Sequence, residues 1–257
     1  MTVALSLLAE DPELHLPPPE GGERIEDDRF CLSIDPDRRA AGVCHLRLPG
    51  EPGRLEGVVD EIRRLLGDVP RVVWNVGSSA QPPDLPARLL ALGLRHPDPP
   101  LDPVAAAMVL TTEPAAVNGV VTRRIETFEE HLIGLEILLA SDRWSAAATA
   151  EKRDRAEEGF ESRRRRGSGQ WLAYLDDKPL AWAATERASA GLFLAGGATL
   201  PEARGRGCYR ALVRARWDEA VRLGLPGLAV QAQYGSSAPT LRRLGFVEVA
   251  TIHTLQS

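Results

Sequence analysis

The chain has 257 residues, of which 31 are Lys or Arg and 36 are Asp or Glu, giving a net charge of −5. This balance provides no basic field for nucleic acid or an anionic membrane, so neither is expected as a partner. The 44% hydrophobic content is enough for one large domain or two small ones. Every apolar run is shorter than a membrane span, and the first ten residues lack the positive charge of a secretory signal.

The three cysteines, Cys31, Cys44 and Cys208, lie far apart in the sequence. Their spacing matches neither a disulfide framework nor the close pairs of a structural zinc site. We therefore expect no metal and a location in the reducing cytoplasm.

Strand and helix patterns alternate in the first half of the chain. A proline-rich acidic stretch at residues 11–28 predicts an exposed loop without a regular element. Further on, apolar residues alternate with polar ones where strands are expected, and recur every three or four residues where helices are expected. The expected elements are strands at residues 29–35, 42–48 and 72–76 and helices at residues 53–67 and 85–92.

A second cycle of the same patterns begins after Pro114. It contains a strongly charged, helix-prone segment and a hairpin that turns at Asp176 and Asp177. The expected helices are residues 128–139, 146–166, 207–223 and a short one that ends at residue 244. The expected strands are residues 120–125, 171–174, 180–186, 192–200, 228–233 and 246–254.

One short motif occurs in both halves, as Gly77-Ser78-Ser79-Ala80 and again as Gly235-Ser236-Ser237-Ala238. Each copy follows a predicted strand and precedes a short helix, which ends at a Leu-Gly pair. Chance could produce four matching residues, but the shared order of the flanking elements favours duplication. We therefore predict an α/β fold of two domains, residues 1–115 and 116–257.

The stretch at residues 198–212 carries the clearest chemical signal. It runs from a predicted strand through the glycine-rich loop Arg204-Gly205-Arg206-Gly207 into an amphipathic helix. Such a loop directs free backbone N–H groups and the positive end of a helix dipole at one point, and glycine lets a bulky anion approach closely. The pattern predicts a pyrophosphate site. The competing interpretation is an ordinary strand-to-helix turn with surface arginines.

This stretch resembles the GNAT acyltransferases, whose signature here is Arg or Gln, two residues, Gly, one residue, then Gly or Ala. Arg204 and Gly207 match, and Tyr209 departs from the pattern at the last position. The resemblance covers residues 118–257 and implies acetyl-CoA as the co-substrate. It also implies a splayed mixed β-sheet flanked by helices, with a bulge at Gly196 and Gly197. The residues that the resemblance assigns to the coenzyme are Ala198, Thr199, Leu200, Arg204, Gly205, Arg206, Gly207, Cys208 and Tyr209.

Competing nucleotide motifs fit poorly. A dinucleotide fingerprint requires glycine at Arg210 and an acidic residue about twenty positions further on, and a Walker loop requires Gly-Lys-Ser/Thr. In the first half, the equivalent loop contains Pro49, Glu51 and Pro52, which remove donors and repel phosphate. That half is therefore expected to be a degenerate GNAT-like domain, in a tandem pairing that resembles mycothiol synthase.

The resemblance implies an N-acetyltransferase in which a primary amine attacks the thioester directly within a ternary complex. Leu241 stands where the family commonly has the tyrosine that protonates the thiolate. Tyr234 is the replacement candidate, with packing across the cleft as its alternative role, and Tyr209 is a weaker one. Glu186 is the candidate base, and an exposed salt bridge is its alternative role.

Two further functions stay open at this point. A non-catalytic acyl-CoA sensor would explain Leu241, whereas an aminoacyl transferase that takes charged transfer RNA would explain the tandem pairing but conflicts with the negative charge. The expected acceptor is a small-molecule or peptide amine, and the expected state is a monomer or homodimer.

Overall fold

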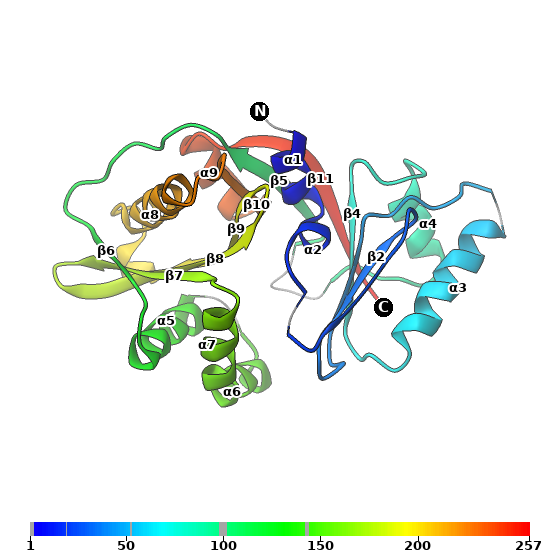
Figure 1. Cartoon of the computed structure of the whole chain (residues 1–257), viewed down its shortest axis with the longest axis horizontal. Helices are drawn as coiled ribbons and strands as arrows, with labels where there is room; N and C mark the ends of the chain where they lie inside the picture. Colours follow the sequence, from blue (N-terminus) through cyan, green and yellow to red (C-terminus); the bar gives the residue numbers. More distant parts are fainter. Residues whose placement is uncertain (1–2, 19, 52, 98–101, 142–143) are drawn as a thin grey trace. The chain divides into compact units, whose positions relative to one another are not determined.

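The computed structural model describes residues 3–18, 20–51, 53–97, 102–141 and 144–257 (Figure 1). The chain separates into two compact units that alternate along the sequence. The N-terminal unit comprises Ser6–Met108, Gln231–Thr240 and Glu248–Ser257. The C-terminal unit comprises Met1–Leu5, Val109–Val230 and Leu241–Val247. The predicted boundary between residues 115 and 116 stays a prediction.

The N-terminal unit is a sheet with helices packed against it. Its helices are α1 (Val3–Glu10), whose first residues belong to the other unit, α2 (Pro12–His15), α3 (Arg54–Leu66) and α4 (Leu85–Ala91). Its strands are β1 (Glu23–Glu26), β2 (Cys31–Ile34), β3 (Ala41–Cys44), β4 (Val72–Gly77), most of β5 (Val104–Leu110) and most of β11 (Val247–Gln256). Strands β1, β2, β3, β4 and β11 neighbour one another in that order, and only the β3–β4 pairing is parallel.

Helix α3 forms where the sequence predicts it. Its apolar residues recur at three- and four-residue spacing, so Leu55, Val59 and Ile62 share one buried face. Glycines bound the helix at both ends, Gly53 before it and Gly67 after it, and Gly67 has a positive φ that a helix end favours. The buried face packs into a core that contains Trp74 and Leu255.

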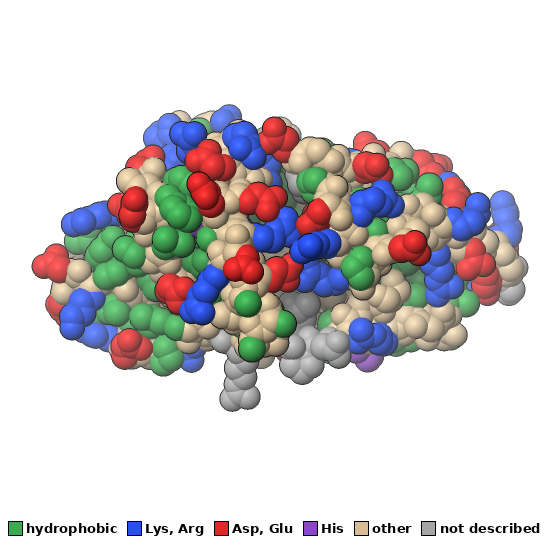
Figure 2. Space-filling model, turned by 90° about the horizontal axis from the view of Figure 1, so that it is seen from below, with side chains coloured by type: hydrophobic (Ala, Val, Ile, Leu, Met, Phe, Trp, Pro, Cys, Tyr) green, Lys and Arg blue, Asp and Glu red, His purple; other side chains and the backbone are tan. Residues whose placement is uncertain are grey.

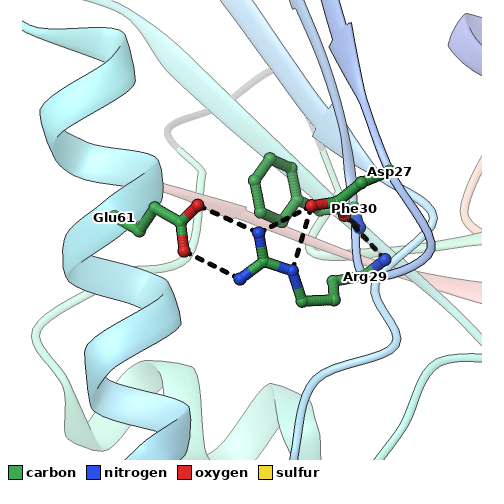
Figure 3. Close-up of polar contacts among 4 residues, drawn as sticks. All are labelled: Asp27, Arg29, Phe30 and Glu61. Atoms are coloured by element: carbon green, nitrogen blue, oxygen red, sulfur yellow. Dashed lines mark hydrogen bonds and ion pairs between the residues drawn. The ribbon is translucent and has the colours of Figure 1, made fainter.

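Arg29 ties the turn between β1 and β2 to helix α3 (Figure 3). Its guanidinium donates to both carboxylate oxygens of Glu61, at 2.7 and 2.9 Å, and to Asp27 at 2.6 and 3.0 Å. Hydrogen bonds to Arg29 lower the pKa of Glu61 and help to lower that of Asp27, although burial opposes both shifts. Asp27 also accepts from the backbone N–H groups of Arg29 and Phe30, so the turn is fixed from both sides.

The C-terminal unit has helices on both faces of the sheet that its own strands form (Figure 1). Its helices are α5 (Phe128–Ser141), α6 (Ala146–Asp154), α7 (Ala156–Arg165), α8 (Cys208–Arg222) and the end of α9 (Ser237–Arg243). Its strands are β6 (Val121–Arg124), β7 (Gly169–Leu175), β8 (Lys178–Ala188), β9 (Gly191–Thr199) and the first half of β10 (Leu228–Gln233). These strands neighbour one another in chain order.

Successive side chains along each strand point to opposite faces of this sheet. Ala181 and Ala183 of β8 face α8, together with Trp171 of β7, whereas Trp182 and Ala184 face α5. Strands β6 to β9 pair antiparallel, while β9 and β10 pair parallel. Within the described residues, the β9–β10 pairing is confined to Leu192 with Leu228 and Phe193 with Ala229. The two strands therefore separate toward their carboxyl ends, as the resemblance implies.

The expectation of an unstructured loop at residues 11–28 is wrong. Helix α2 and strand β1 lie in that range, and Asp11 is 2% exposed. Pro12 occupies the first turn of α2, where its missing N–H costs no hydrogen bond. Arg24 donates to the carbonyl groups of Glu13 and Leu16 and so completes the end of the helix. Strand β5 was also missed, although its apolar run between Pro103 and Thr111 is typical of a buried strand.

Candidate functional site

The connection from β9 to α8 is built around two glycines in left-handed conformation. After β9 the chain forms the 3₁₀ turn η1 (Pro201–Ala203), and Gly205 and Gly207 then have φ values of +76° and +93°. A side chain at either position would be strained. Gly207 is the residue at which α8 begins, and a Cβ there would lie 3.1 Å from Cγ1 of Val117.

The N-terminal end of α8 is open to a ligand. The first bond within the helix runs from the Ala211 N–H to the Gly207 carbonyl, at 2.9 Å, and no side chain caps Gly207. The N–H groups of Cys208, Tyr209 and Arg210 therefore have no acceptor within the helix. They carry the partial positive charge of the helix dipole, which favours an anion at this point.

Both arginines of the loop are exposed, and their contacts with described residues lie at the surface. Arg204 donates to the carbonyl groups of Thr199, at 3.4 Å, and Ser141, at 3.2 Å. Arg206 pairs with Asp176 at 3.3 Å, and both side chains are largely exposed. Such contacts contribute less than about 1 kcal/mol. Either guanidinium is therefore free to turn toward a bound diphosphate at little cost.

Cys208 contributes its backbone rather than its thiol. Its side chain is buried with Ala203 and Leu212 beneath α8. Burial raises the pKa of the thiol, and the nearby charge of Arg206 opposes that rise only in part. A neutral buried thiol is a poor nucleophile, so no covalent chemistry is assigned to Cys208.

Strand β9 has an irregularity directly before the two glycines expected to hold a bulge. Ala184 of β8 opposes Gly196, but Glu186 opposes Phe193, so β9 has one more residue than β8 across this interval. The extra residue falls at Leu194 and Ala195 and makes this a β-bulge. Gly197 is exposed, and a Cβ on it would lie 2.9 Å from the Tyr209 ring. Gly197 therefore leaves the strand surface low beside Tyr209, whereas a Cβ on Gly196 would lie 3.1 Å from the Trp182 ring.

Two buried polar atoms of the C-terminal unit lack hydrogen-bond partners within the described residues, and both border β9. One is Oγ1 of Thr199, at the end of the strand. The other is Nη2 of Arg216, whose Nη1 donates to the Gly196 carbonyl at 3.3 Å. Buried polar groups normally have partners, so this strand retains hydrogen-bonding capacity for a ligand. Thr199 was predicted at the site from the sequence, and Arg216 was not.

Ala198 and Leu200 face the opposite side of the sheet from α8. Ala198 is buried with Trp182, and Leu200 packs partly buried in the same cluster. Leu200 also borders a shallow apolar hollow along α5. The other residues that line it are Leu132, Ile133, Glu136, Ile137 and Ala140. The side chains of Ala198 and Leu200 thus serve packing, and only their backbone groups are available to a ligand on β9.

Glu186 lies at the β8 side of the bulge in an ion-pair cluster. Its Oε1 accepts from Arg163 at 3.1 Å and from Arg166 at 3.3 Å, and its Oε2 accepts from the Ser168 hydroxyl. The Glu186 side chain is 15% exposed. The basic run that ends α7 thus turns two arginines toward this carboxylate, a contact that the sequence did not reveal. The role of Glu186 as a base stays a prediction.

Tyr234 directly follows β10 and belongs to the N-terminal unit. Its hydroxyl donates to Oε1 of Glu248 and lies 3.3 Å from Oγ1 of Thr251, both on β11. A hydroxyl bound to a carboxylate is fixed in orientation. Its role as a proton donor stays a prediction.

A group of carboxylates lies at the ends of β3 and β4 in the N-terminal unit. Glu10 accepts from the backbone N–H and hydroxyl of Ser79 at 2.7 and 2.6 Å, and Asp11 accepts from the His45 N–H at 3.1 Å. Glu13 accepts from Asn75 at 3.4 Å and is half-buried. We call Glu10–Glu13 the acidic segment. It lies where the parallel pairing of β3 and β4 has ended, and a Cβ on Gly77 would collide with Glu10.

Surface charge is mixed on the face of the molecule seen in Figure 2, where blue and red side chains lie among green ones. No helix within the described residues has the length and apolar character needed to cross a membrane. Among the described residues, no group of three or more His, Cys, Asp or Glu side chains could hold a metal ion.

Several solved structures share this architecture. A GCN5-related N-acetyltransferase from Kribbella flavida aligns with 100% of this chain and 96% of its own, at 17% identity and a TM-score of 0.72. A tandem GNAT protein from the clavulanic acid biosynthesis pathway aligns with 98% of this chain and 87% of its own, at 17% identity and a TM-score of 0.62. A GCN5-related N-acetyltransferase from Sphaerobacter thermophilus aligns with 90% of this chain and 80% of its own, at 15% identity and a TM-score of 0.56.

These alignments extend over the whole chain, including one with a tandem protein, so the predicted fold class of two GNAT-like halves is confirmed. At identities of 17% and below, the likeness shows the fold and leaves the activity to be argued from the site. No protein-family model and no curated protein matches the sequence.

Proposed function

We propose that this protein transfers an acetyl group from acetyl-CoA to a primary amine of a small molecule or peptide. The observation that carries the proposal is the open N-terminus of α8, which follows two left-handed glycines beside a bulged β9. Backbone N–H groups, a helix dipole and exposed arginines converge there, as an anionic coenzyme requires. The same order of strand, glycine-rich loop and helix carries the resemblance to the GNAT acyltransferases and supports the proposal.

The residues present fit acetyl-CoA. The N–H groups of Cys208 and Tyr209 would hold the pyrophosphate, with Arg204 and Arg206 as mobile counter-charges. The unpartnered Thr199 hydroxyl and the backbone of residues 198–200 would receive the pantetheine arm. When bound, the coenzyme supplies the acetyl group as a thioester. The protein's remaining tasks are to orient the amine, remove its proton and stabilise the charge on the leaving sulfur.

Removing a proton from the acceptor is a substantial step. A primary amine with a pKa of about 10.4 is almost fully protonated at neutral pH, and deprotonation costs roughly 4–5 kcal/mol. We propose Glu186 as the group that receives this proton, directly or through water. Its two arginine partners and Ser168 hold the carboxylate in one orientation. Direct attack within a ternary complex requires no covalent intermediate on the protein.

Isothermal titration with acetyl-CoA, followed by thiol release with a panel of amines, tests the proposal. We expect one acetyl-CoA per chain, because the acidic segment fills the equivalent place in the first half, and turnover with at least one class of amine. Binding without turnover on any acceptor would favour the acyl-CoA sensor. Absence of binding would exclude both functions.

Glu186→Gln is expected to lower kcat about 100-fold, while the KM for acetyl-CoA changes little. Arg163→Met provides the matched control, because it breaks the same ion pair but keeps the carboxylate. Steady-state kinetics and thermal unfolding of both variants are the measurements. Equal losses of activity in the two variants would assign Glu186 a structural role instead.

Tyr234→Phe removes one hydroxyl and keeps the ring. If Tyr234 protonates the leaving thiolate, kcat is expected to fall about 10- to 100-fold without a comparable loss of acetyl-CoA affinity. Glu248→Gln is the control, since it weakens the hydrogen bond but leaves the hydroxyl in place. Unchanged kcat in Tyr234→Phe would remove this residue from the mechanism.

A further inference from the structure

Arg216 is a fully buried arginine in the middle of α8. Its side chain is 0% exposed, its Nε donates to the Leu212 carbonyl at 3.0 Å, and its Nη1 donates to the Gly196 carbonyl at 3.3 Å. The guanidinium carbon lies 5.7 Å from the centre of the Tyr209 ring. Its Nη2 has no hydrogen-bond partner within the described residues. The side chain therefore bridges α8 and the bulged part of β9.

A buried guanidinium without a carboxylate is costly. Arginine remains charged in proteins, and a buried charge normally has a partner of opposite sign. Arg163 in the same unit satisfies this rule through Glu186, whereas the described residues provide no carboxylate within ion-pair distance of Arg216. Burial lowers the pKa of Arg216, and Tyr209 is the titratable group that faces it and opposes this effect. The described residues therefore leave the charge of Arg216 without an anionic partner.

The position of Arg216 indicates which anion would pair with its guanidinium. Gly196, its acceptor, lies three residues before Thr199, roughly 10 Å along the strand at about 3.3 Å per residue. The adjoining Gly197 is exposed, so the charge lies just beneath accessible backbone. A pantetheine arm that leaves the loop and follows β9 passes this point with its sulfur end. During acetyl transfer, the negative charge that would develop nearest to Arg216 is the charge on the sulfur of the leaving thiolate.

We propose that Arg216 stabilises the thiolate of CoA as it leaves, a role that a tyrosine would fill and that Leu241 cannot. The inference rests on the proposed function. The amine nitrogen forms its bond to the acyl carbon, the C–S bond breaks, and the electron pair of that bond stays on sulfur. The proton lost by the amine passes to the base or to water, and the thiolate that Arg216 has stabilised takes up a proton from Tyr234 or from solvent. The charge of Arg216 is present throughout and is not consumed.

Binding of free CoA tests this role without turnover. CoA carries a free thiol, and a neighbouring positive charge favours the thiolate and so lowers the pKa of that thiol. We expect the affinity of the wild-type protein for CoA to rise about five- to tenfold between pH 6.5 and 9, with release of a proton on binding. Acetyl-CoA has no free thiol, so its affinity is expected to remain constant over this range. Titration in two buffers of different ionisation enthalpy measures both quantities.

Arg216→Met is expected to abolish the pH dependence of CoA affinity and to lower kcat about 10- to 100-fold. Its affinity for acetyl-CoA is expected to stay within about threefold of the wild-type value. Arg216→Gln keeps a donor for the Gly196 carbonyl without the charge, and it replaces the methionine variant if that protein does not fold. Arg222→Met is the control, because Arg222 is an exposed arginine at the far end of the same helix.

Each outcome bears on one claim. An identical pH dependence in wild type and in Arg216→Met or Arg216→Gln would overturn the role of Arg216 while leaving the acetyl-CoA site intact. Loss of the pH dependence in Tyr209→Phe, but not in the Arg216 variants, would transfer the role to the phenol and overturn this inference. Failure of the wild-type protein to bind either CoA or acetyl-CoA would overturn the proposed function itself.

Discussion

Gly207→Asp is expected to weaken acetyl-CoA binding more than 100-fold while the protein stays folded. The substitution places a carboxylate at the N-terminus of α8, where it satisfies the free N–H groups and excludes a diphosphate by charge and volume. Backbone strain at a φ of +93° costs about 1–2 kcal/mol, and aspartate tolerates this region better than most residues. Isothermal titration measures the affinity, and circular dichroism with thermal unfolding measures the fold.

Two variants separate the causes of that loss. Gly207→Asn has nearly the same volume without the charge, so it is expected to retain more affinity than the aspartate variant. Gly224→Asp makes the same change just beyond the other end of α8, at a φ of +68° and with open space around the added Cβ. It is expected to bind acetyl-CoA normally. Unchanged affinity in Gly207→Asp would refute the assignment of the loop.

Glu13→Gln is expected to stabilise the protein increasingly as pH rises. Burial raises the pKa of Glu13 above its ordinary value, although hydrogen bonds from Asn75 and the backbone oppose the shift. The folded state therefore keeps a proton that the unfolded chain releases, and stability is lost as pH rises toward the folded-state pKa. Each pH unit over which this difference persists costs about 1.4 kcal/mol. The glutamine variant has no such proton to retain.

Urea unfolding of both proteins between pH 5 and 8 measures this effect. The difference in the free energy of unfolding is expected to be small at pH 5 and to grow with pH until the folded-state pKa is reached. Glu151→Gln, at an exposed position of α6, is expected to show a constant and small difference. A constant difference for Glu13→Gln would show that the side chain titrates alike in both states.

Most of the fold follows from local patterns that the sequence displays. Helix α3 and the strands around it were predicted because their apolar spacing is regular and glycines mark their ends. The loop before α8 was predicted because Gly205 and Gly207 can adopt left-handed backbone conformations that few other residues tolerate. In these places one segment of sequence contains the whole physical reason for the structure.

The features that were missed depend on contacts between distant segments. The prolines and acids at residues 11–28 predict solvent exposure, yet Asp11 is buried and Glu13 is half-buried. His45, directly after β3, and Asn75, on β4, supply their partners. From the sequence, Arg216 is expected to be a polar residue on the exposed side of a surface helix. It follows the buried Leu212 by four residues, however, and so lies on the inner face of α8. That spacing was the one available signal. The partner that we propose for it is a ligand rather than another part of the chain.

The acidic segment also bears on how the first half responds to small molecules. A segment attached to the same chain presents its carboxylates at an effective local concentration in the millimolar range. A free anionic ligand at micromolar concentration would have to displace them from the Ser79 and His45 N–H groups. These N–H groups are therefore already occupied by carboxylates of the same chain, and a free anion of ordinary micromolar affinity is not expected to replace them.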